Sequence, residues 1–570
     1  MQSETKNCQN CKKDFTIEPE DFSFYEKIKV PPPTFCPWCR FIRRMTWRNE
    51  RALYKRNCDL CKKDIISTHQ KNAPFPVYCW SCWHSDKWDA TTYGVDYDFS
   101  RPFFEQYQEL LNKVPHFALW QRNVTNSEYA NLVGESKNVY LSVSVVLESE
   151  NVFYSKAIDT GFNIFDSMNL KNSENCYENV EGERNYNSQY LIMSRNCIDS
   201  YYLIDCLNCH NCFMSSNLRN QQYYFRNKKL SREDYEKEVA KIELGKRSVR
   251  QDLENEFSEL RRNAIYKFSN VILSPNSTGH NLSNVKNGKV CFDCYDGEDF
   301  KYCYRAFISK DAMDYSYAMH SELMYEYTTG ANYNYNVKFS YAANSQVRNA
   351  EYTYSCISST NLFGCAGVQS KDNVIFNKVY GKEKFEKLRT QIIKQMYDLS
   401  YTDRKGRVYQ YGEFFPVELS PYTYNESAAQ EFETLIKEKA EEKGYKWHEP
   451  EERDFKTTIK ARDIPDDIKD VGDKILNEVL ECVHTGKCNH QCTEAFKITQ
   501  GELQFYRKHS IPLPDKCPNC RYYERFAKVP LPKLYKRVCM NCDKVEFETP
   551  YSPERSEKVF CESCYNKEIY

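Results

Sequence analysis

The sequence lacks the features that mark membrane and secreted proteins. None of its apolar runs approaches the length of a transmembrane helix, and its first residues contain no apolar core of a signal peptide. We therefore expect a cytoplasmic protein, in which the 27 cysteines are kept reduced. In a reducing compartment, paired cysteines indicate metal ligands before they indicate disulfides.

The chain also lacks the motifs of common catalytic sites. It contains no phosphate-binding glycine-rich loop, no zinc-protease helix motif and no Gly-x-Ser-x-Gly nucleophile elbow. Asp293, Asp296, Glu298 and Asp299 could serve glycan chemistry on an exposed face. A solvated turn explains them better, because nothing pairs them with a specific acid or base environment. We expect a protein without enzymatic activity, and a carbohydrate-active β-solenoid enzyme stays as an alternative.

Net charge is also small, at −1 for the whole chain. It is unevenly placed, because residues 1–88 carry six more basic than acidic side chains and residues 482–570 carry four more. The segment between them therefore carries −11. This asymmetry indicates mildly basic ends and an acidic centre.

Aromatic residues, in contrast, are plentiful, at 15% of the chain with 45 tyrosines. Tyrosine suits half-buried sheet surfaces, so the composition favours a mainly β protein. Short alternating segments with Asn, Gly or Asp at their joints recur roughly every 10–25 residues in the central region. We predict a right-handed β-solenoid in two halves with capping helices. An ordinary antiparallel β-sandwich is the alternative.

Two internal repeats organise the chain. Residues 11–61 align without a gap with residues 492–542, with 19 of 51 positions identical. Residues 211–242 align less closely with residues 361–392. Each copy of this second repeat ends in a helix-like stretch, and in the first copy Ser231 is followed three residues later by Asp234, as in a capping box.

These repeats predict six segments. They are a double zinc-ribbon module at 1–88, solenoid halves at 89–230 and 266–380, a helical spacer at 231–265, helices and a linker at 381–481, and a second double zinc-ribbon module at 482–570. Within the linker we predict helices at about 427–443 and 466–482.

Sixteen cysteines have the spacing of zinc ligands. Cys-x-x-Cys knuckles recur at both ends, at separations typical of zinc sites. We predict four closed structural Zn²⁺ sites with the ligands Cys8, Cys11, Cys36, Cys39; Cys58, Cys61, Cys79, Cys82; Cys488, Cys492, Cys517, Cys520; and Cys539, Cys542, Cys561, Cys564. Cys488 gives a longer Cys-x-x-x-Cys knuckle, so His490 is a competing ligand. We assign Cys482 to the core of the preceding helix.

These motifs carry a resemblance. A Cys-x-x-Cys knuckle followed by Phe-x-Ile, Phe-Tyr, Pro-x-Pro and Cys-Pro-x-Cys-Arg resembles the treble-clef-like zinc ribbons of bacterial proteins. With the central Asn217-Leu218-Arg219-Asn220, the whole chain resembles an uncharacterised bacterial family from reduced-genome candidate phyla. The resemblance implies zinc binding in the two terminal modules and no particular activity.

A basic segment follows the second knuckle. If residues 40–56 form one helix, its basic side chains share one face that would suit phosphates, namely Arg40, Arg43, Arg44, Arg48, Arg51 and Lys55. The alternative, which we favour, is that this face pairs with the acidic solenoid, because Glu524 replaces Arg43 in the second copy.

The central cysteines leave one more question. Cys206, Cys209 and Cys212 are close enough in sequence to suggest a metal site. Cysteine also behaves as a small buried hydrophobe, and we favour this second interpretation.

Together these observations predict a zinc-binding scaffold or adaptor with an unknown protein partner. RNA or ribosome binding through the basic ribbon faces is the alternative.

Overall fold

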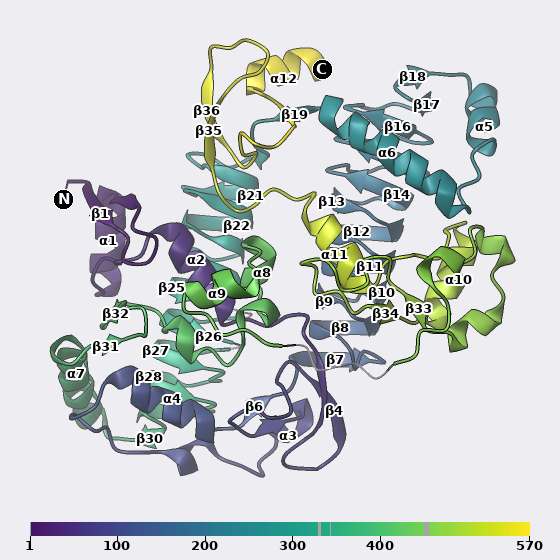
Figure 1. Cartoon of the computed structure of the whole chain (residues 1–570). Helices are drawn as coiled ribbons and strands as arrows, with labels where there is room; N and C mark the ends of the chain where they lie inside the picture. The colour runs from purple at the N-terminus through teal and green to yellow at the C-terminus, as the bar shows by residue number, and fades with distance from the viewer. Residues whose placement is uncertain (1, 329–331, 343, 450–454) are drawn as a thin grey trace. The chain divides into compact units, whose positions relative to one another are not determined.

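The computed structural model describes residues 2–328, 332–342, 344–449 and 455–570 (Figure 1). The chain forms two compact units, each made of separate stretches of sequence. Unit 1 comprises residues 1–120, 269–448 and 532–534, and unit 2 comprises residues 121–268, 449–531 and 535–570. Each unit therefore joins the cysteine-rich segment from one end of the chain to the more distant half of the central region.

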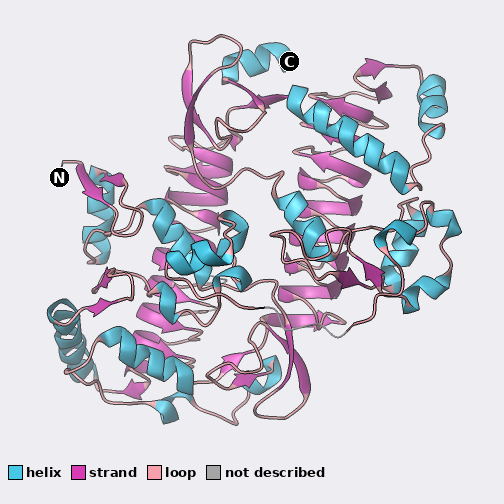
Figure 2. Ribbon diagram, viewed as in Figure 1, coloured by secondary structure: helices cyan, strands magenta, loops and turns pink. Residues whose placement is uncertain are grey.

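The central part of unit 2 is a stack of mostly parallel strands. Figure 2 shows each stack of the protein as a ladder of magenta strands. The strands in unit 2 are β7 (Gln121–Thr125), β8 (Asn131–Tyr140), β9 (Val143–Val146), β10 (Glu150–Phe153), β11 (Lys156–Phe165), β12 (Met168–Tyr177), β13 (Val180–Glu183), β14 (Tyr186–Ile192), β15 (Tyr201–Ile204), β16 (Phe213–Ser216), β17 (Tyr224–Phe225) and β18 (Lys228–Lys229). Pairing advances by a constant step along most of the stack, so that Gln189 pairs with Tyr201 and Tyr201 with Phe213.

Unit 1 contains a second stack built in the same way. Its strands are β20 (Val271–Ile272), β21 (Gly279–Lys286), β22 (Cys291–Lys301), β23 (Tyr304–Phe307), β24 (Lys310–Met319), β25 (Glu322–Tyr327), β26 (Tyr335–Tyr341), β27 (Arg348–Tyr354), β28 (Thr360–Ala366), β29 (Asp372–Ile375) and β30 (Lys378–Val379). Two of its steps, from Glu322 to Tyr335 and on to Arg348, are longer by a single residue. Because the stacked strands pair in parallel, the antiparallel sandwich is excluded for both segments.

Every third residue in the stacks has an unusual backbone conformation. From Asn151 to Arg226, and from Asn281 to Glu326, φ is positive at each third position. Asn and Asp tolerate this left-handed region better than other non-glycine residues, and Asn is the commonest residue there. Asn175 and Asn211 were expected at joints, and the predicted spacing of roughly 10–25 residues between strand segments includes the observed step of twelve, but the three-residue period of the corners was not predicted.

Side-chain ladders connect these turns from one step of the stack to the next. Asn138, Asn151, Asn163 and Asn175 donate or accept amide hydrogen bonds in series, at 2.8–3.1 Å. Similar ladders in unit 1 include Asn336, Asn349, Asn361 and Asn373. The amide side chains thereby satisfy one another at the corners of the stack.

Small residues fill the interior. Ser155 and Ser167 are completely buried. The Oγ of Ser167 donates to the carbonyl of Phe165 at 2.9 Å and accepts from the backbone N–H of Asn179 at 3.2 Å. An inward serine thus uses its hydroxyl to satisfy a backbone amide one step further along the stack.

Helices cover the last strand of each stack. In unit 2 the β17–β18 hairpin leads into α5 (Arg232–Ala240), and in unit 1 the β29–β30 hairpin leads into α7 (Lys382–Asp398). The N-cap of the first of these helices is confirmed, because the backbone N–H of Asp234 donates to Ser231 Oγ at 3.1 Å, but the Asp234 carboxylate accepts from Ser231 Oγ at 2.8 Å and does not close a capping box. None of the helices among the described residues is long and apolar enough to cross a bilayer.

The two helices predicted between the stack and the second cysteine module are wrong. Residues 427–443 contain only the short α8 (Ala429–Phe432) and α9 (Lys437–Glu442), because the chain turns between them to bury Phe432. Residues 466–482 form the 3₁₀ helices η5 (Ile468–Asp470) and η6 (Asp473–Asn477) and the strand β33 (Leu480–Glu481). Pairing of β33 with β34 (Ala495–Phe496) overrides its helical pattern.

The remaining elements surround the stacks. In unit 1 they are β1 (Glu4–Asn7), β2 (Asp14–Ile17), α1 (Pro19–Ile28), α2 (Pro37–Thr46), β3 (Tyr54–Asn57), β4 (Asp64–Ser67), β5 (Val77–Tyr78), α3 (Trp80–Trp83), η1 (Ala90–Tyr93), α4 (Phe103–Lys113), β6 (His116–Phe117), β31 (Tyr401–Thr402), β32 (Val408–Tyr409), η2 (Val417–Leu419) and η3 (Tyr424–Glu426). In unit 2 they are α6 (Arg247–Asn263), β19 (Ile265–Lys267), η4 (Ala461–Asp463), α10 (Gln500–Lys508), α11 (Pro518–Phe526), β35 (Tyr535–Val538), β36 (Glu546–Thr549), β37 (Lys558–Phe560) and α12 (Glu562–Ile569).

The interior serines give a first prediction. Ser167→Ala leaves the buried N–H of Asn179 without its acceptor, and we expect the free energy of unfolding of unit 2 to fall by about 1–3 kcal/mol. Ser258→Ala, on an exposed face of α6, is the control and should change it by less than about 0.5 kcal/mol. Denaturant unfolding measures both, and equal effects would contradict the role given to the inward hydroxyl.

Candidate metal centres

Among the residues that the structure describes, five groups of side chains each bring four metal-ligating atoms within 4.8 Å of one another. Four of the groups contain only cysteine. They are site 1 (Cys8, Cys11, Cys36, Cys39), site 2 (Cys58, Cys61, Cys79, Cys82), site 3 (Cys482, Cys492, Cys517, Cys520) and site 4 (Cys539, Cys542, Cys561, Cys564). The fifth group shares Cys520 with site 3 and contains His484, Cys488 and His490. Fifteen of the sixteen predicted ligands thus lie in the four cysteine sites.

A common local structure builds these sites. In site 1 the first two cysteines lie in a turn, in which the N–H of Lys12 donates to the carbonyl of Cys8 at 2.9 Å and Lys12 has φ of 59°. The third cysteine, Cys36, is the N-cap of α2, and Cys39 lies in its first turn. Cys79, Cys517 and Cys561 begin α3, α11 and α12 in the same way. The helix start directs backbone N–H groups at the sulfurs.

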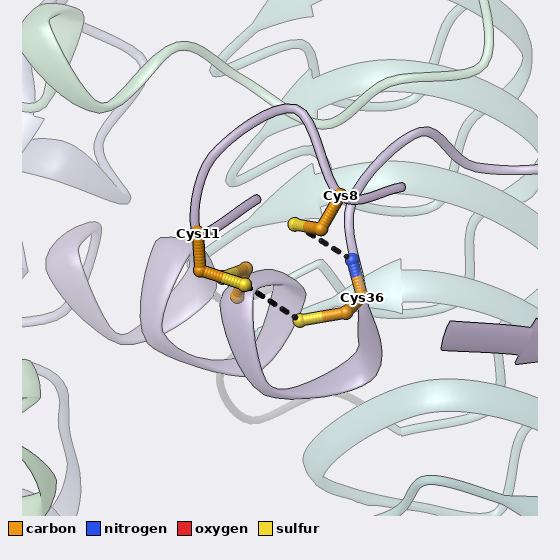
Figure 3. A group of neighbouring side chains, drawn as sticks. Cys8, Cys11 and Cys36 are labelled. Atoms are coloured by element: carbon orange, nitrogen blue, oxygen red, sulfur yellow. Dashed lines mark hydrogen bonds between the residues drawn. The ribbon is translucent and has the colours of Figure 1, made fainter. Parts of the chain in front are cut away.

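The sulfur separations fit tetrahedral zinc. Zn–S bonds of about 2.3 Å place the corners of a regular tetrahedron about 3.8 Å apart. The Sγ atoms of Cys11 and Cys36, joined by a dashed line in Figure 3, are 3.8 Å apart, and those of Cys61 and Cys79 are 3.9 Å apart. In site 3, Cys492 and Cys517 are 3.9 Å apart. Several tetracysteine groups of the chain therefore fit zinc binding.

Backbone hydrogen bonds favour the thiolate form that zinc requires. The N–H of Cys36 donates to Cys8 Sγ at 3.2 Å (Figure 3), and that of Cys561 donates to Cys539 Sγ at 3.2 Å. Burial raises the pKa of Cys539, but the N–H groups of Cys561 and Cys542 outweigh it and lower this pKa to about 6. A preformed thiolate reduces the proton release that accompanies metal binding.

Site 3 differs from its prediction. Cys482, and not Cys488, completes the four thiolates, because β33 pairs with β34 as β1 pairs with β2 and places Cys482 where Cys8 lies. The N–H of Cys517 donates to Cys482 Sγ at 3.3 Å, as that of Cys36 does to Cys8 Sγ. The assignment of Cys482 to the core of a helix was therefore wrong. The position of Cys482 directly after β33, as Cys8 lies directly after β1, could have identified it. The nine residues between Cys482 and Cys492 obscured this equivalence.

The basic segment does not form one helical face. Helix α2 ends at Thr46, so Arg48 and Arg51 lie beyond it and Lys55 is exposed on β3. Most of the arginines that were considered for phosphate contacts are instead buried. Arg40, Arg43, Arg44 and Arg48 are no more than 3% exposed. The prediction of a single exposed basic face was therefore wrong, because these side chains point into unit 1.

The buried arginines of α2 pair with carboxylates of the strand stack. Arg40 Nε lies 2.7 Å from Asp314 Oδ2, and Arg44 Nη1 lies 3.2 Å from Asp314 Oδ1. Arg43 contacts Glu326 at 2.6 Å and Glu413 at 2.7 Å. Burial raises the pKa of Glu326 to about 7 despite Arg43 and Arg44, which lower it. The segment therefore meets the acidic stack inside its own unit.

Unit 2 repeats this arrangement. Arg521 and Arg525, which align with Arg40 and Arg44, contact Asp166 at 2.6 and 2.7 Å. Arg525 also contacts Glu178 at 2.6 Å. In both units the aspartate and the glutamate of the stack have positive φ and lie one step apart, so they occupy the same corner position in successive steps.

The remaining candidate residues serve the stacks. The ten central cysteines are buried, and none belongs to a metal-ligand group among the residues that the structure describes; they are Cys176, Cys197, Cys206, Cys209, Cys212, Cys291, Cys294, Cys303, Cys356 and Cys365. The metal hypothesis for Cys206, Cys209 and Cys212 is therefore not supported.

The carboxylates noted for glycan chemistry also have structural partners. Asp293, Asp296 and Asp299 occupy positive-φ corners, and Asp296 accepts from Asn284 at 2.8 Å. Glu298 lies at an open groove of about 870 Å³, but Lys286 and then Lys310 lower its pKa, opposite to what a general acid needs.

Neither a scan against models of protein families nor a search among curated proteins gave a match.

The assignment of site 3 gives a second prediction. Cys482→Ser removes one thiolate of site 3, and because a structural zinc held there would contribute on the order of 10 kcal/mol, we expect unit 2 to unfold at a markedly lower temperature. Cys488→Ser leaves the four thiolates of site 3 in place and should lower the unfolding temperature of unit 2 by less than Cys482→Ser does. Thermal unfolding followed by circular dichroism measures both, and the opposite order would restore Cys488 as the structural ligand.

The buried ion pairs give a third prediction. Arg44→Gln leaves Asp314 and Glu326 buried with one cation fewer, and we expect unit 1 to lose about 3–5 kcal/mol of unfolding free energy. Arg101→Gln, whose guanidinium is 39% exposed, should have no measurable effect. Denaturant titrations report both values, and similar small effects would show that the buried pairs do not determine the docking of α2.

Proposed function

We propose that this chain is a non-enzymatic scaffold or adaptor protein held together by four structural Zn²⁺ ions. The observation that carries the proposal is the four-thiolate composition of sites 1–4. Four thiolates close the coordination sphere of zinc, so no position is left for a catalytic water. Each site fixes the start of a helix, and two of these helices lie against the strand stacks through buried ion pairs.

The same proposal includes the finer fold assignments. The parallel pairing at regular steps supports two β-solenoids, and the knuckle followed by a helix start supports treble-clef-like ribbons. These features agree with the resemblance to bacterial zinc-ribbon proteins. A cytoplasmic location and a protein partner belong to the proposal as well, because long stacked strands offer an extended binding surface.

RNA or ribosome binding is the second candidate. Burial of Arg40, Arg43, Arg44 and Arg48 removes most of the basic segment from contact with phosphates. Exposed lysines at the knuckles still favour it, namely Lys13, Lys55 and Lys63. Such contacts would be independent of nucleotide sequence and strongly dependent on salt.

Metal content tests the proposal. The purified chain should hold at least four zinc ions, and stripping them with a chelator at high concentration should unfold the cysteine modules in both units, because small ribbons have little core without metal. Elemental analysis and circular dichroism measure the two effects. Two or fewer ions, or a fold that persists without metal, would contradict it.

RNA binding needs its own measurement. The triple variant Lys13→Glu, Lys55→Glu, Lys63→Glu should leave zinc content unchanged, and on the scaffold hypothesis it should not alter retention of single-stranded RNA across a salt titration. A salt-dependent loss of RNA binding in this variant would make the second candidate the leading one.

A further inference from the structure

The second copy of the cysteine module contains a loop that the first copy lacks. Cys8 and Cys11 are separated by two residues, whereas Cys482 and Cys492, at the equivalent places, are separated by nine. The additional residues contain three potential metal ligands: His484, Cys488 and His490. An insertion of this length into a structural knuckle is unnecessary for site 3, because site 1 is complete without it.

The loop is folded back onto the helix that carries Cys520. The N–H of Thr485 donates to the carbonyl of Cys482 at 2.9 Å, and Thr485, Gly486 and Gln491 have positive φ. Asn519 Nδ2 of α11 donates to the carbonyl of Gln491 at 2.8 Å. The ring of His490 stacks on Tyr523 at 5.5 Å between centroids. These contacts hold the loop over the first turns of α11.

In this conformation four ligand atoms converge. One nitrogen each of His484 and His490 and the Sγ atoms of Cys488 and Cys520 lie within 4.8 Å of one another. The Sγ atoms of Cys488 and Cys520 are 3.7 Å apart, close to the tetrahedral edge of about 3.8 Å that zinc requires. Both imidazoles have a buried Nδ1 that makes no hydrogen bond among the described residues.

A carboxylate lies close to one histidine of this group. His484 Nε2 lies 3.8 Å from Glu524 Oε1, and Glu524 is itself held by Lys516 at 2.8 Å. Metal-bound histidines commonly have a carboxylate near their second ring nitrogen, which orients the ring. In the first copy this helix position is Arg43, which contacts Glu326 of the stack and Glu413.

We propose that site 3 is one half of a two-metal centre, in which His484, Cys488, His490 and Cys520 bind a second divalent transition-metal ion and the Cys520 thiolate bridges the two ions. Site 3 places Cys482 3.9 Å from Cys520, and the second group places Cys488 3.7 Å from it. The two groups are therefore tetrahedra that share one corner. The inference rests on zinc occupancy of site 3, which the proposed function assumes.

The charge of the centre favours a second ion. A single Zn²⁺ among four thiolates leaves a net charge of about −2, whereas two ions with five thiolates and two neutral imidazoles leave about −1. Because the centre is partly buried, the smaller charge is less costly to desolvate. Two imidazoles and two thiolates select a borderline-soft ion such as Zn²⁺ or Co²⁺ over Mg²⁺ or Ca²⁺.

Metal counting on the full chain tests the proposal directly. After reconstitution with excess Zn²⁺ and gel filtration, the unaltered chain should hold five ions, and His484→Ala/His490→Ala should hold four, with an unfolding temperature that falls less than that of Cys482→Ser because site 3 stays complete. His509→Ala, an imidazole of unit 2 outside the group, is the control and should hold five. Four ions in both the unaltered chain and the double variant would overturn the two-metal centre while leaving the proposed function intact, and absence of zinc from the chain would overturn both.

Cobalt gives a second, spectroscopic readout. Two Co²⁺ ions bridged by one thiolate are spin-coupled, so the chain loaded with five Co²⁺ should show the paramagnetic resonance of only three isolated ions. His484→Ala/His490→Ala, where it folds, should show four. Five uncoupled ions, or a chain that saturates at four uncoupled ions, would overturn the bridge through Cys520.

Discussion

Burial of charge is the constraint on which both units depend. In each unit two arginines, one helical turn apart, enter the protein and meet an aspartate and a glutamate from successive steps of the stack. An unpaired charge at these depths would cost several kcal/mol. The carboxylates occur at one corner of two successive steps, so α2 and α11 each satisfy their arginines in only one register along the stack. Docking is thereby specific although most of the stack surface repeats.

The candidate metal sites lie at the start of the same helices. Cys36 caps α2, Cys39 lies in its first turn and Arg40 follows directly. A metal that fixes both cysteines therefore fixes the direction in which Arg40 and Arg44 leave the helix. Helix α2 also buries Phe41, Ile42 and Met45, so hydrophobic packing holds it as well, and a metal at the knuckle would add to the ion pairs in setting its direction.

Much of this could be predicted from the sequence, and the failures have physical causes. The duplicated knuckles identified fifteen of sixteen thiolates, because a turn with two cysteines is a local feature. Cys482 was missed because its partner in the knuckle lies beyond an inserted loop. The pairing of Arg40 with Asp314 joins residues 274 positions apart, which no local pattern reveals. The three-residue period of the stacks was not predicted, because hydrophobic residues are usually searched for at the periods of strands and helices. The inward positions hold Ser, Cys, Val and Ile, which are alike in size but not in polarity, so they form no hydrophobic pattern.

The two copies of the helix show how one position became free for a different use. In unit 1, Glu326 is matched by Arg43 and Arg44. In unit 2, the equivalent Glu178 is matched by Arg525 and by Lys528, whose Nζ lies 3.3 Å away. Each stack glutamate therefore keeps two cations, but in the second copy the additional cation comes from beyond the end of the helix. The position of Arg43 no longer has to be basic there. Glu524 occupies it and faces the loop of His484, so with Lys528 as the second cation for Glu178 this helix position contributes to the surroundings of a metal-ligand cluster.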